Sequence, residues 1–420
     1  MRIGGVSLTP SHGRVSCMGV SLDVSATLAV AALVLLVGRG VISRVEFLRK
    51  YTIPEPVVGG LVAALTITLL YAIGVRVTFD TSFQPGLMLA FFATIGLSAD
   101  ARSLAKGGVP LVLFTLCVVG MLFMENIIGI GAAKAMGIDP VIGLIAGSVT
   151  MAGGHGTGAA WGQRFVDVFG VTEAPAVGLS TATFGLVMGG IIGGPVAIRL
   201  VRRLQAKGVP LGVAGAVALP RDEAEATGPF TAERLTITIM LIAASAAVGT
   251  ALARWTENPV FTLPTFVWTL LVGAVLRNGL AVTKVHVVDG QALAFAGTVA
   301  LSLFLAMALM SLRLWELASL ALPMLVILAL QALAVAAYTS FITFRVMGAN
   351  YEAAVLVAGQ CGFGLGATPT AIANIQAVCS RYGAAPQAFI LVPVVGAFLI
   401  DVANAIVISL FVNIIQMMRN

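Results

Sequence analysis

Long runs of apolar residues, separated by short polar stretches, account for most of the chain. Most runs are apolar on every face and about 20 residues long, the length that an α-helix needs to cross the hydrocarbon core of a bilayer. A membrane β-barrel would instead show segments of about 10 residues in which apolar and polar positions alternate. The pattern predicts membrane-spanning helices at residues 24–43, 54–75, 87–98, 109–133, 176–200, 234–254, 264–283, 292–311, 319–344 and 387–414.

Two stretches interrupt this pattern with glycine, hydroxyl and amide residues. They are Ala146–Trp161 (AGSVTMAGGHGTGAAW) and Ala358–Asn374 (AGQCGFGLGATPTAIAN). The apolar arm before the first stretch, residues 140–146, is too short to cross the bilayer. Glycine disfavours a helix, and open backbone within a membrane survives only where protein or a watery cavity surrounds it. We therefore expect two re-entrant hairpins, at about 139–170 and 352–380.

A polar segment at 204–232, with Pro, Gly, Ala and acidic residues, divides the chain into two halves. We expect this segment to be a cytoplasmic linker between a first repeat at 23–203 and a second repeat at 233–420. Residues 1–22 are a polar N-terminal extension, and Met18 is a possible native start. Each half then holds five helices and one re-entrant hairpin.

Three landmarks of the first half recur in the second half at a nearly constant offset. Tyr51–Pro54 (YTIP) matches Phe261–Pro264 (FTLP), Ala90–Leu97 (AFFATIGL) matches Leu303–Met310 (LFLAMALM), and Ala146–Gly147 matches Ala358–Gly359. Because each half has an odd number of spans, the second half lies upside down in the membrane relative to the first. This arrangement is the inverted-topology repeat of secondary transporters.

Composition and charge narrow the class of protein further. Of the 420 residues, 59% are hydrophobic and only 10% are charged, whereas soluble domains carry about 25% charged residues. The net charge of +6 does not indicate nucleic-acid binding, because most Lys and Arg residues fall at helix ends that this topology places in the cytoplasm. The 4 Cys and 3 His residues are scattered, which predicts neither a disulfide framework nor a transition-metal site. No nucleophile–base grouping typical of an enzyme is apparent.

The hairpin tips carry the residues that we expect to bind a solute. Backbone N–H groups and helix N-termini bind carboxylates, glycine lets the backbone come close, and hydroxyl groups add donors. The expected substrate-binding residues are Ser148, Thr150, Gly153, Gly154, His155, Gly156, Thr157, Gly158, Gly362, Gly364, Gly366, Thr368 and Thr370. His155 could donate to a substrate carboxylate or only cap its hairpin, and the sequence favours neither role.

Four residues are expected to bind Na⁺, and the sequence predicts no other cofactor. Asp401 lies inside an apolar run, where an ionised carboxylate needs a partner, and Asn404 shares its helix face. We interpret Asp401 as a ligand of Na⁺ or of a substrate ammonium group, with a structural pair to a neighbouring helix as the alternative. Pro369 frees a backbone carbonyl group in the second tip, and Asn374 adds an amide oxygen on the same arm. Glu125, another carboxylate in an apolar run, is a functional candidate by default.

Several motifs resemble those of the bacterial sodium/glutamate symporter family, over nearly the whole chain from about Met18. They are YTIPEPVVGG at 51–60, LMLAFFATIGLSA at 87–99, GGHGTGAAW at 153–161, SLFLAMALMSLRLWELASLALPML at 302–325 and GFGLGATPTAIAN at 362–374. The resemblance implies a homodimeric inner-membrane carrier that takes up L-glutamate with Na⁺. It also implies inverted five-helix repeats, elevator-like movement and a distant kinship with sodium/citrate carriers. The glycines of the family's re-entrant loops match Gly153, Gly154, Gly156, Gly158, Gly362, Gly364 and Gly366.

The sequence thus predicts an all-α polytopic membrane protein, an elevator-type transporter that imports L-glutamate by Na⁺ symport across the bacterial inner membrane. Its expected partners are L-glutamate, Na⁺, the lipid bilayer and a second copy of the chain, with no nucleic acid. The alternative is a Na⁺-coupled symporter for another small carboxylate, such as citrate or a hydroxy acid. A tricarboxylate calls for a fixed arginine, and Arg381 just past the second hairpin leaves that alternative open. A channel is disfavoured because two hairpins that meet at the midplane indicate an occluded site.

Overall fold

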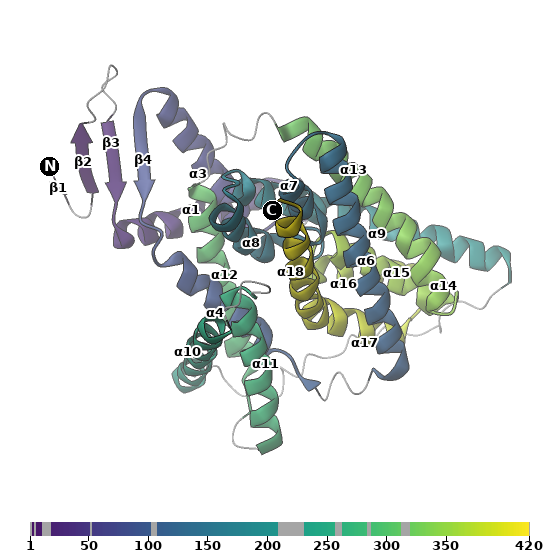
Figure 1. The fold of residues 1–420 in the computed structure, drawn as a ribbon. Helices are drawn as coiled ribbons and strands as arrows, with labels where there is room; N and C mark the ends of the chain where they lie inside the picture. Colours follow the sequence, from purple (N-terminus) through teal and green to yellow (C-terminus); the bar gives the residue numbers. More distant parts are fainter. Residues whose placement is uncertain are drawn as a thin grey trace.

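The computed structural model describes residues 2–3, 6–10, 18–50, 53–101, 107–208, 231–256, 263–283, 287–311 and 320–419. Within these residues, nine helices are long and apolar enough to cross a membrane (Figure 1). They are α1 (Val24–Arg44), α3 (Glu55–Ala72), α6 (Gly108–Ala135), α9 (Ala174–Ala206), α10 (Ala232–Trp255), α11 (Thr265–Thr283), α12 (Gly290–Met310), the helix Leu322–Val346 and α18 (Ile400–Arg419). The prediction of a polytopic helical membrane protein is therefore confirmed.

The remaining helices are shorter or interrupted. The helix that ends at Val346 consists of α13 (Ala321–Tyr338), a π-helical turn (Thr339–Thr343) and α14 (Phe344–Val346). The others are α2 (Glu46–Lys50), α4 (Gln84–Leu97), α7 (Pro140–Leu144), a π-helical turn (Ile145–Val149), α8 (Gly154–Phe169), α15 (Tyr351–Leu365), α16 (Thr368–Tyr382), α17 (Pro386–Val394) and a π-helical turn (Val395–Leu399) that leads into α18. Nine of the ten predicted spans coincide with the nine long helices, apart from shifts at their ends, whereas the predicted span 87–98 is the 14-residue helix α4. The segments predicted as hairpins contain α7, the π-helical turn and α8 in the first case, and α15 and α16 in the second. The expected linker at 204–232 begins within the last turn of α9, which ends at Ala206. Its residues 209–230 lie outside the described residues.

The helices pack in two groups. In the first, which we call the scaffold group, α3 packs against α1 and α12, α4 packs against α11 and α12, and α10 packs against α11. Glycine makes some of these contacts possible, because a Cβ at Gly96 would collide with the carbonyl oxygen of Leu270 on α11. Such small residues let membrane helices approach backbone to backbone.

The second group, which we call the hairpin group, holds α6 to α9 and α13 to α18. Its interior is filled by large buried side chains, among them Trp161, Phe165, Phe114 and Phe363. The Phe114 ring on α6 meets the Phe363 ring on α15 edge to face, with 6.0 Å between ring centroids. Protein therefore surrounds both hairpins, which is the condition under which non-helical backbone is tolerated at membrane depth.

A small sheet beside α1 and α3 was not predicted from the sequence (Figure 1). Its strands are β1 (Arg2–Ile3), β2 (Val6–Pro10), β3 (Met18–Leu22) and β4 (Val75–Phe79), in that order, with β3 parallel to β4 and the other pairs antiparallel. The helix predicted to reach residue 75 ends earlier, and Gly74 follows it with a left-handed backbone (φ +87°). The next residues, VRVTF, are rich in β-branched side chains and alternate in burial, which favours a strand.

Candidate functional site

In the first hairpin the backbone departs from right-handed helical geometry at two glycines. A hydrogen bond from the Val141 N–H to the Asp139 side chain (2.9 Å) starts α7. The backbone leaves helical geometry at Gly147 (φ −90°, ψ −140°). At Gly154 it is left-handed (φ +64°), a conformation that glycine adopts without steric cost. Because α8 begins there, its first N–H groups and positive dipole end lie at the tip. The Gly154 N–H itself donates to the Thr150 carbonyl oxygen (2.9 Å).

The second hairpin has a similar tip. Its backbone is non-helical at Gly366 and Ala367, and α16 then begins at Thr368 with Pro369 in its first turn, where proline is tolerated. The Thr368 hydroxyl group donates to the carbonyl oxygen of Gly396 (2.5 Å), in the π-helical turn before α18. This bond ties the N-terminus of α16 to the last membrane helix.

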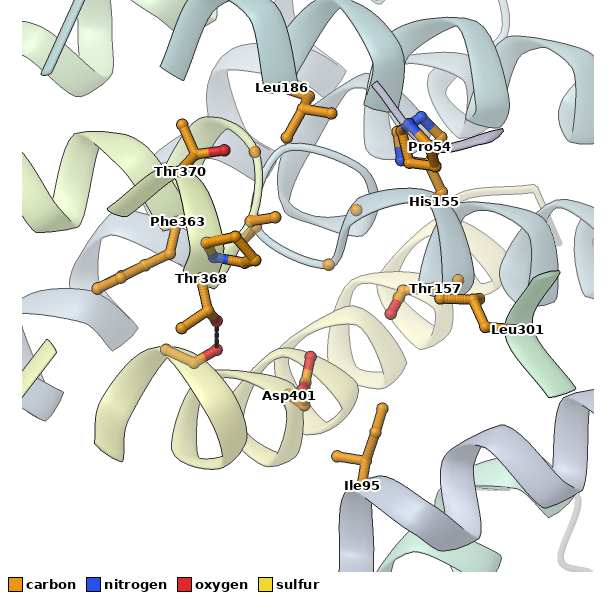
Figure 2. A pocket seen from close by; sticks show the side chains of 18 of the residues that line it. Pro54, Ile95, His155, Thr157, Leu186, Leu301, Phe363, Thr368, Thr370 and Asp401 are labelled. Carbon is orange, nitrogen blue, oxygen red and sulfur yellow. Dashed lines mark hydrogen bonds between the residues drawn. The ribbon is translucent and has the colours of Figure 1, made fainter. Parts of the chain in front are cut away.

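A cavity of about 620 Å³ lies between the two tips (Figure 2), a size typical of small-molecule sites. Its described lining comes mainly from both tips, from α4 and α12 of the scaffold group, and from α18, and it also includes Pro54, Leu186 and Gly396. Figure 2 shows Asp401 between Thr157 of the first hairpin and Thr368 of the second. The predicted site residues that line it are Gly153, Gly154, His155, Gly156, Thr157, Gly366, Thr368, Pro369, Thr370 and Asp401.

His155 has one ring nitrogen already engaged. Its Nε2 lies 3.0 Å from the Oγ1 of Thr183 on α9. The hydroxyl hydrogen of Thr183 goes to the carbonyl oxygen of Leu179 (2.8 Å), so Nε2 is the donor in the pair between His155 and Thr183. The ring thus anchors the first tip to α9, and only Nδ1 and the backbone N–H remain for a substrate.

Thr370 and Asp401 line the cavity, and their side-chain oxygen atoms have no partners among the described residues. Thr370 is 5% exposed, and its Oγ1 has no hydrogen bond to a described group. The Asp401 carboxyl group has no charged or hydrogen-bonding neighbour in the described part of the chain. The alternative of a structural ion pair for Asp401 therefore gains no support from these residues.

The other expected site residues lie behind the tips and do not line the cavity. Gly362 packs against the backbone of Ala371 on the other arm of the hairpin, so a larger residue there would push the two arms apart. Gly364 packs against the Met121 side chain of α6. These residues can act on a substrate only through the tips that they support. They are Ser148, Thr150, Gly158, Gly362, Gly364, Asn374 and Asn404.

Apolar residues of the cavity wall were not predicted. They include Phe91 and Ile95 of α4, and Leu301 and Leu305 of α12. A Cβ at Gly156 would lie 2.6 Å from Cε1 of Phe91, so α4 packs directly on the first tip. No sequence signal marks such residues, because an apolar side chain in an apolar span looks the same whether it faces lipid, protein or a cavity.

Comparison with known proteins decides the family. A family model described as sodium/glutamate symporter matches residues 20–384. The chain belongs to the sodium/glutamate symporter family. The sodium/glutamate symporter of Escherichia coli is 52% identical over 393 residues, which are 93% of this chain and 97% of that protein. The sodium/glutamate symporter of Haemophilus influenzae is 45% identical over 403 residues, which are 96% of this chain and 100% of that protein.

Membership of the sodium/glutamate symporter family makes this chain a transporter rather than an enzyme, and a multi-pass membrane protein. The resemblance that the motifs indicate is thereby confirmed. A solved structure of the sodium proton antiporter MjNhaP1 from Methanocaldococcus jannaschii aligns with this chain at a TM-score of 0.42 and 11% sequence identity. The alignment covers 93% of this chain and 98% of the antiporter chain. That similarity is too low to indicate a shared mechanism.

Proposed function

We propose that this protein imports L-glutamate across the bacterial inner membrane by Na⁺ symport. The observation that carries the proposal is the cavity that both glycine-rich tips and Asp401 line together. Family membership supports the substrate and the ion, because the relatives in E. coli and H. influenzae are sodium/glutamate symporters.

The chemistry of the cavity matches that of glutamate, which has two carboxylates and one ammonium group. The N-termini of α8 and α16 offer N–H groups and positive dipole ends to carboxylates. Thr157 and Thr370 add hydroxyl groups, and Asp401 adds a negative charge for an ammonium group or for Na⁺. In this proposal each tip binds one carboxylate, and neither tip forms a complete site alone.

We propose that the coupling Na⁺ binds on the α18 side of the cavity. Na⁺ in such carriers is coordinated by oxygen atoms, including those of unwound backbone. Asp401 and Pro369 line the cavity, whereas Asn374 and Asn404 lie behind it. Na⁺ is the only coupling ion that this proposal requires, and it is carried rather than held as a cofactor.

Inverted repeats and an elevator movement are part of the same proposal. In the predicted repeat, α3 of the first half corresponds to α11 of the second, and α4 corresponds to α12. The structure packs α3 against α12, and it packs the corresponding pair, α11 and α4, in the same way against each other. Both hairpins belong to the hairpin group. This shared location supports the proposal that the hairpin group moves as one body against the scaffold group. The homodimer rests on the family resemblance alone.

A symporter for a tricarboxylate is the less favoured alternative. It would require a fixed arginine beside the second tip. Arg381 is exposed, with its guanidinium group 5.4 Å from the centre of the Tyr382 ring, and it is absent from the described lining of the cavity. The described lining therefore supplies no cation for a third carboxylate.

Transport by purified protein in proteoliposomes tests the proposal. An inward Na⁺ gradient should drive uptake of radiolabelled L-glutamate, and an equal choline gradient should not. Counterflow with unlabelled L-glutamate, citrate and hydroxy acids then ranks the substrates. Glutamate uptake that needs no Na⁺, or counterflow that citrate supports and glutamate does not, would overturn the proposal.

A further inference from the structure

Three buried polar residues from three elements meet behind the first tip. They are Asn126 of α6, Ser148 of the π-helical turn after α7, and Asn404 of α18, with exposures of 0%, 0% and 1%. The Ser148 N–H donates to Oδ1 of Asn126 (2.8 Å). Nδ2 of Asn404 donates to the Ser148 carbonyl oxygen (2.7 Å). The peptide groups on both sides of the Ser148 Cα are therefore held by side chains from neighbouring helices.

Two oxygen atoms of this cluster lack partners among the described residues. They are Oγ of Ser148 and Oδ1 of Asn404. Buried polar atoms are nearly always hydrogen-bonded, so each unpaired one calls for a bound species. Both carboxyl oxygens of Glu125, Oε1 of Gln331 and the donor Nδ2 of Asn126 are also buried without a described partner. Gln331 donates to the backbone carbonyl oxygen of Glu125, the residue before Asn126. Within the cluster, the amide oxygen of Asn404 can only accept and the Ser148 hydroxyl oxygen has lone pairs to offer, so a cation can satisfy both atoms.

We propose that Oγ of Ser148 and Oδ1 of Asn404 are ligands of a Na⁺ subsite behind the first tip, separate from the cavity. The inference rests on the proposed Na⁺ symport and deepens it. Neutral hydroxyl and amide oxygens suit a monovalent cation, and unwound backbone beside a discontinuous helix is where carriers of this kind hold Na⁺. Gly147 supplies that unwound backbone, and a Cβ there would lie 2.7 Å from Oδ1 of Asn126.

The position of this subsite couples the cation to the substrate. The Ser148 carbonyl oxygen accepts hydrogen bonds both from Asn404 and from the N–H of Gly153 (3.1 Å). Gly153 lines the cavity. A cation on Ser148 and Asn404 therefore fixes the backbone that presents the first tip to the substrate. Na⁺ at the subsite should raise the affinity for glutamate, and by linkage glutamate should raise the affinity for Na⁺.

The experiment compares Ser148→Ala and Asn404→Ala with wild type, using the full-length protein. A matched control is Ser409→Ala, because Ser409 is also buried on α18 but its hydroxyl group already donates to the Ala405 carbonyl oxygen (2.7 Å). The first measurement is thermal stabilisation by NaCl relative to choline chloride, without substrate. The second is the Na⁺ dependence of glutamate uptake in proteoliposomes, with the KM for glutamate at saturating Na⁺.

The two alanine variants should need about tenfold more Na⁺ for half-maximal stabilisation and for half-maximal uptake. Their KM for glutamate at saturating Na⁺ should stay unchanged, and the Ser409 control should match wild type. If an alanine variant fails to fold, Asn404→Asp, which keeps an oxygen ligand, should retain the Na⁺ response, and Ser148→Cys, which replaces it by sulfur, should lose it.

Unchanged Na⁺ dependence in both alanine variants would overturn the subsite, and would leave water as the partner of these atoms. A higher KM for glutamate at saturating Na⁺, with normal Na⁺ dependence, would also overturn it by placing Ser148 at the substrate. Failure of the proposed function would give a different set of results. Na⁺ would still stabilise wild type and not the alanine variants, but neither wild type nor the variants would take up glutamate.

Discussion

Two threonines of the second tip differ in whether their hydroxyl groups already have partners. Thr368 donates to the Gly396 carbonyl oxygen, whereas Oγ1 of Thr370 is buried at the cavity wall without a partner among the described residues. At the residue scale, this difference separates side chains that build the site from side chains available to a ligand. Asp401 belongs with Thr370, because no described group satisfies its carboxyl group.

Thr370→Val should raise the KM for glutamate about tenfold, because a hydrogen bond to a charged group contributes about 1.5–3 kcal/mol. Initial uptake rates over a range of glutamate concentrations at saturating Na⁺ measure this effect. Thr181→Val is the control, since Thr181 is equally buried but donates within α9 to the Val177 carbonyl oxygen (2.8 Å). Equal KM values for the two variants would exclude Thr370 as a substrate ligand.

Asp401→Asn should abolish or strongly weaken Na⁺-driven uptake, because the amide removes the negative charge that a cation in the cavity requires. The measurement is the Na⁺ concentration dependence of uptake at fixed glutamate concentration. Asp167→Asn is the control, since Asp167 is an exposed carboxylate of α8 that does not line the cavity. An Asp401→Asn carrier with the Na⁺ dependence of wild type would remove Asp401 from the list of ligands.

At the scale of the element, each hairpin is a helix interrupted so that a new N-terminus begins near the other hairpin. Glycine has two separate roles in this construction. Gly154 adopts the left-handed backbone at the tip, and Gly362 lets the two arms of the second hairpin pack closely. The first role concerns the substrate directly, whereas the second concerns only the support of the tip.

Gly154→Val should abolish transport while the protein still folds and inserts. A side chain at φ +64° is strained by about 1–2 kcal/mol, and its Cβ would lie 3.3 Å from the Gly366 carbonyl oxygen of the other tip. Uptake in proteoliposomes and gel-filtration profiles separate activity from folding. Gly131→Val is the control, because Gly131 is exposed on α6 and a Cβ there would meet nothing within 4 Å. Normal uptake by Gly154→Val would show that the tips need not approach each other.

At the scale of the whole molecule, the cavity lies where the hairpin group meets the scaffold group. Gly156 of the first tip packs on Phe91 of α4, with Leu301 of α12 beside it. This contact is apolar, and apolar contacts without hydrogen bonds can slide with little directional cost. The arrangement favours movement of one group past the other during transport.

Cysteines at Phe91 and Gly156, bridged by a short bifunctional thiol reagent, should stop transport, and reduction should restore it. The bridge would fix α4 of the scaffold group to the first tip, which the proposed movement separates. Uptake before bridging, after bridging and after reduction is the measurement. The control pair is Asp139→Cys with Arg419→Cys, two residues that form an ion pair within the hairpin group. Full transport by the bridged 91–156 protein would contradict relative movement at this contact.

The sequence by itself determined the helical spans and the family, and it predicted the two hairpins. The physical reason is that bilayer thickness sets the length of each apolar run, and glycine in such a run is costly unless the backbone opens. It also marked the chemistry of the tips and of Asp401, because a carboxylate inside an apolar run is rarely without function.

Only the tertiary structure decided which of those residues face the cavity. Thr368, Thr370 and Asp401 line it, whereas Asn374 and Asn404 lie behind it. Each asparagine lies about one helical turn beyond a residue that lines the cavity, and only packing decides which turn of a helix borders the cavity. The apolar wall of α4 and α12 and the sheet formed by β1 to β4 were likewise set by packing between segments far apart in the chain. Local sequence patterns carry no record of such long-range contacts, so these features required the folded molecule.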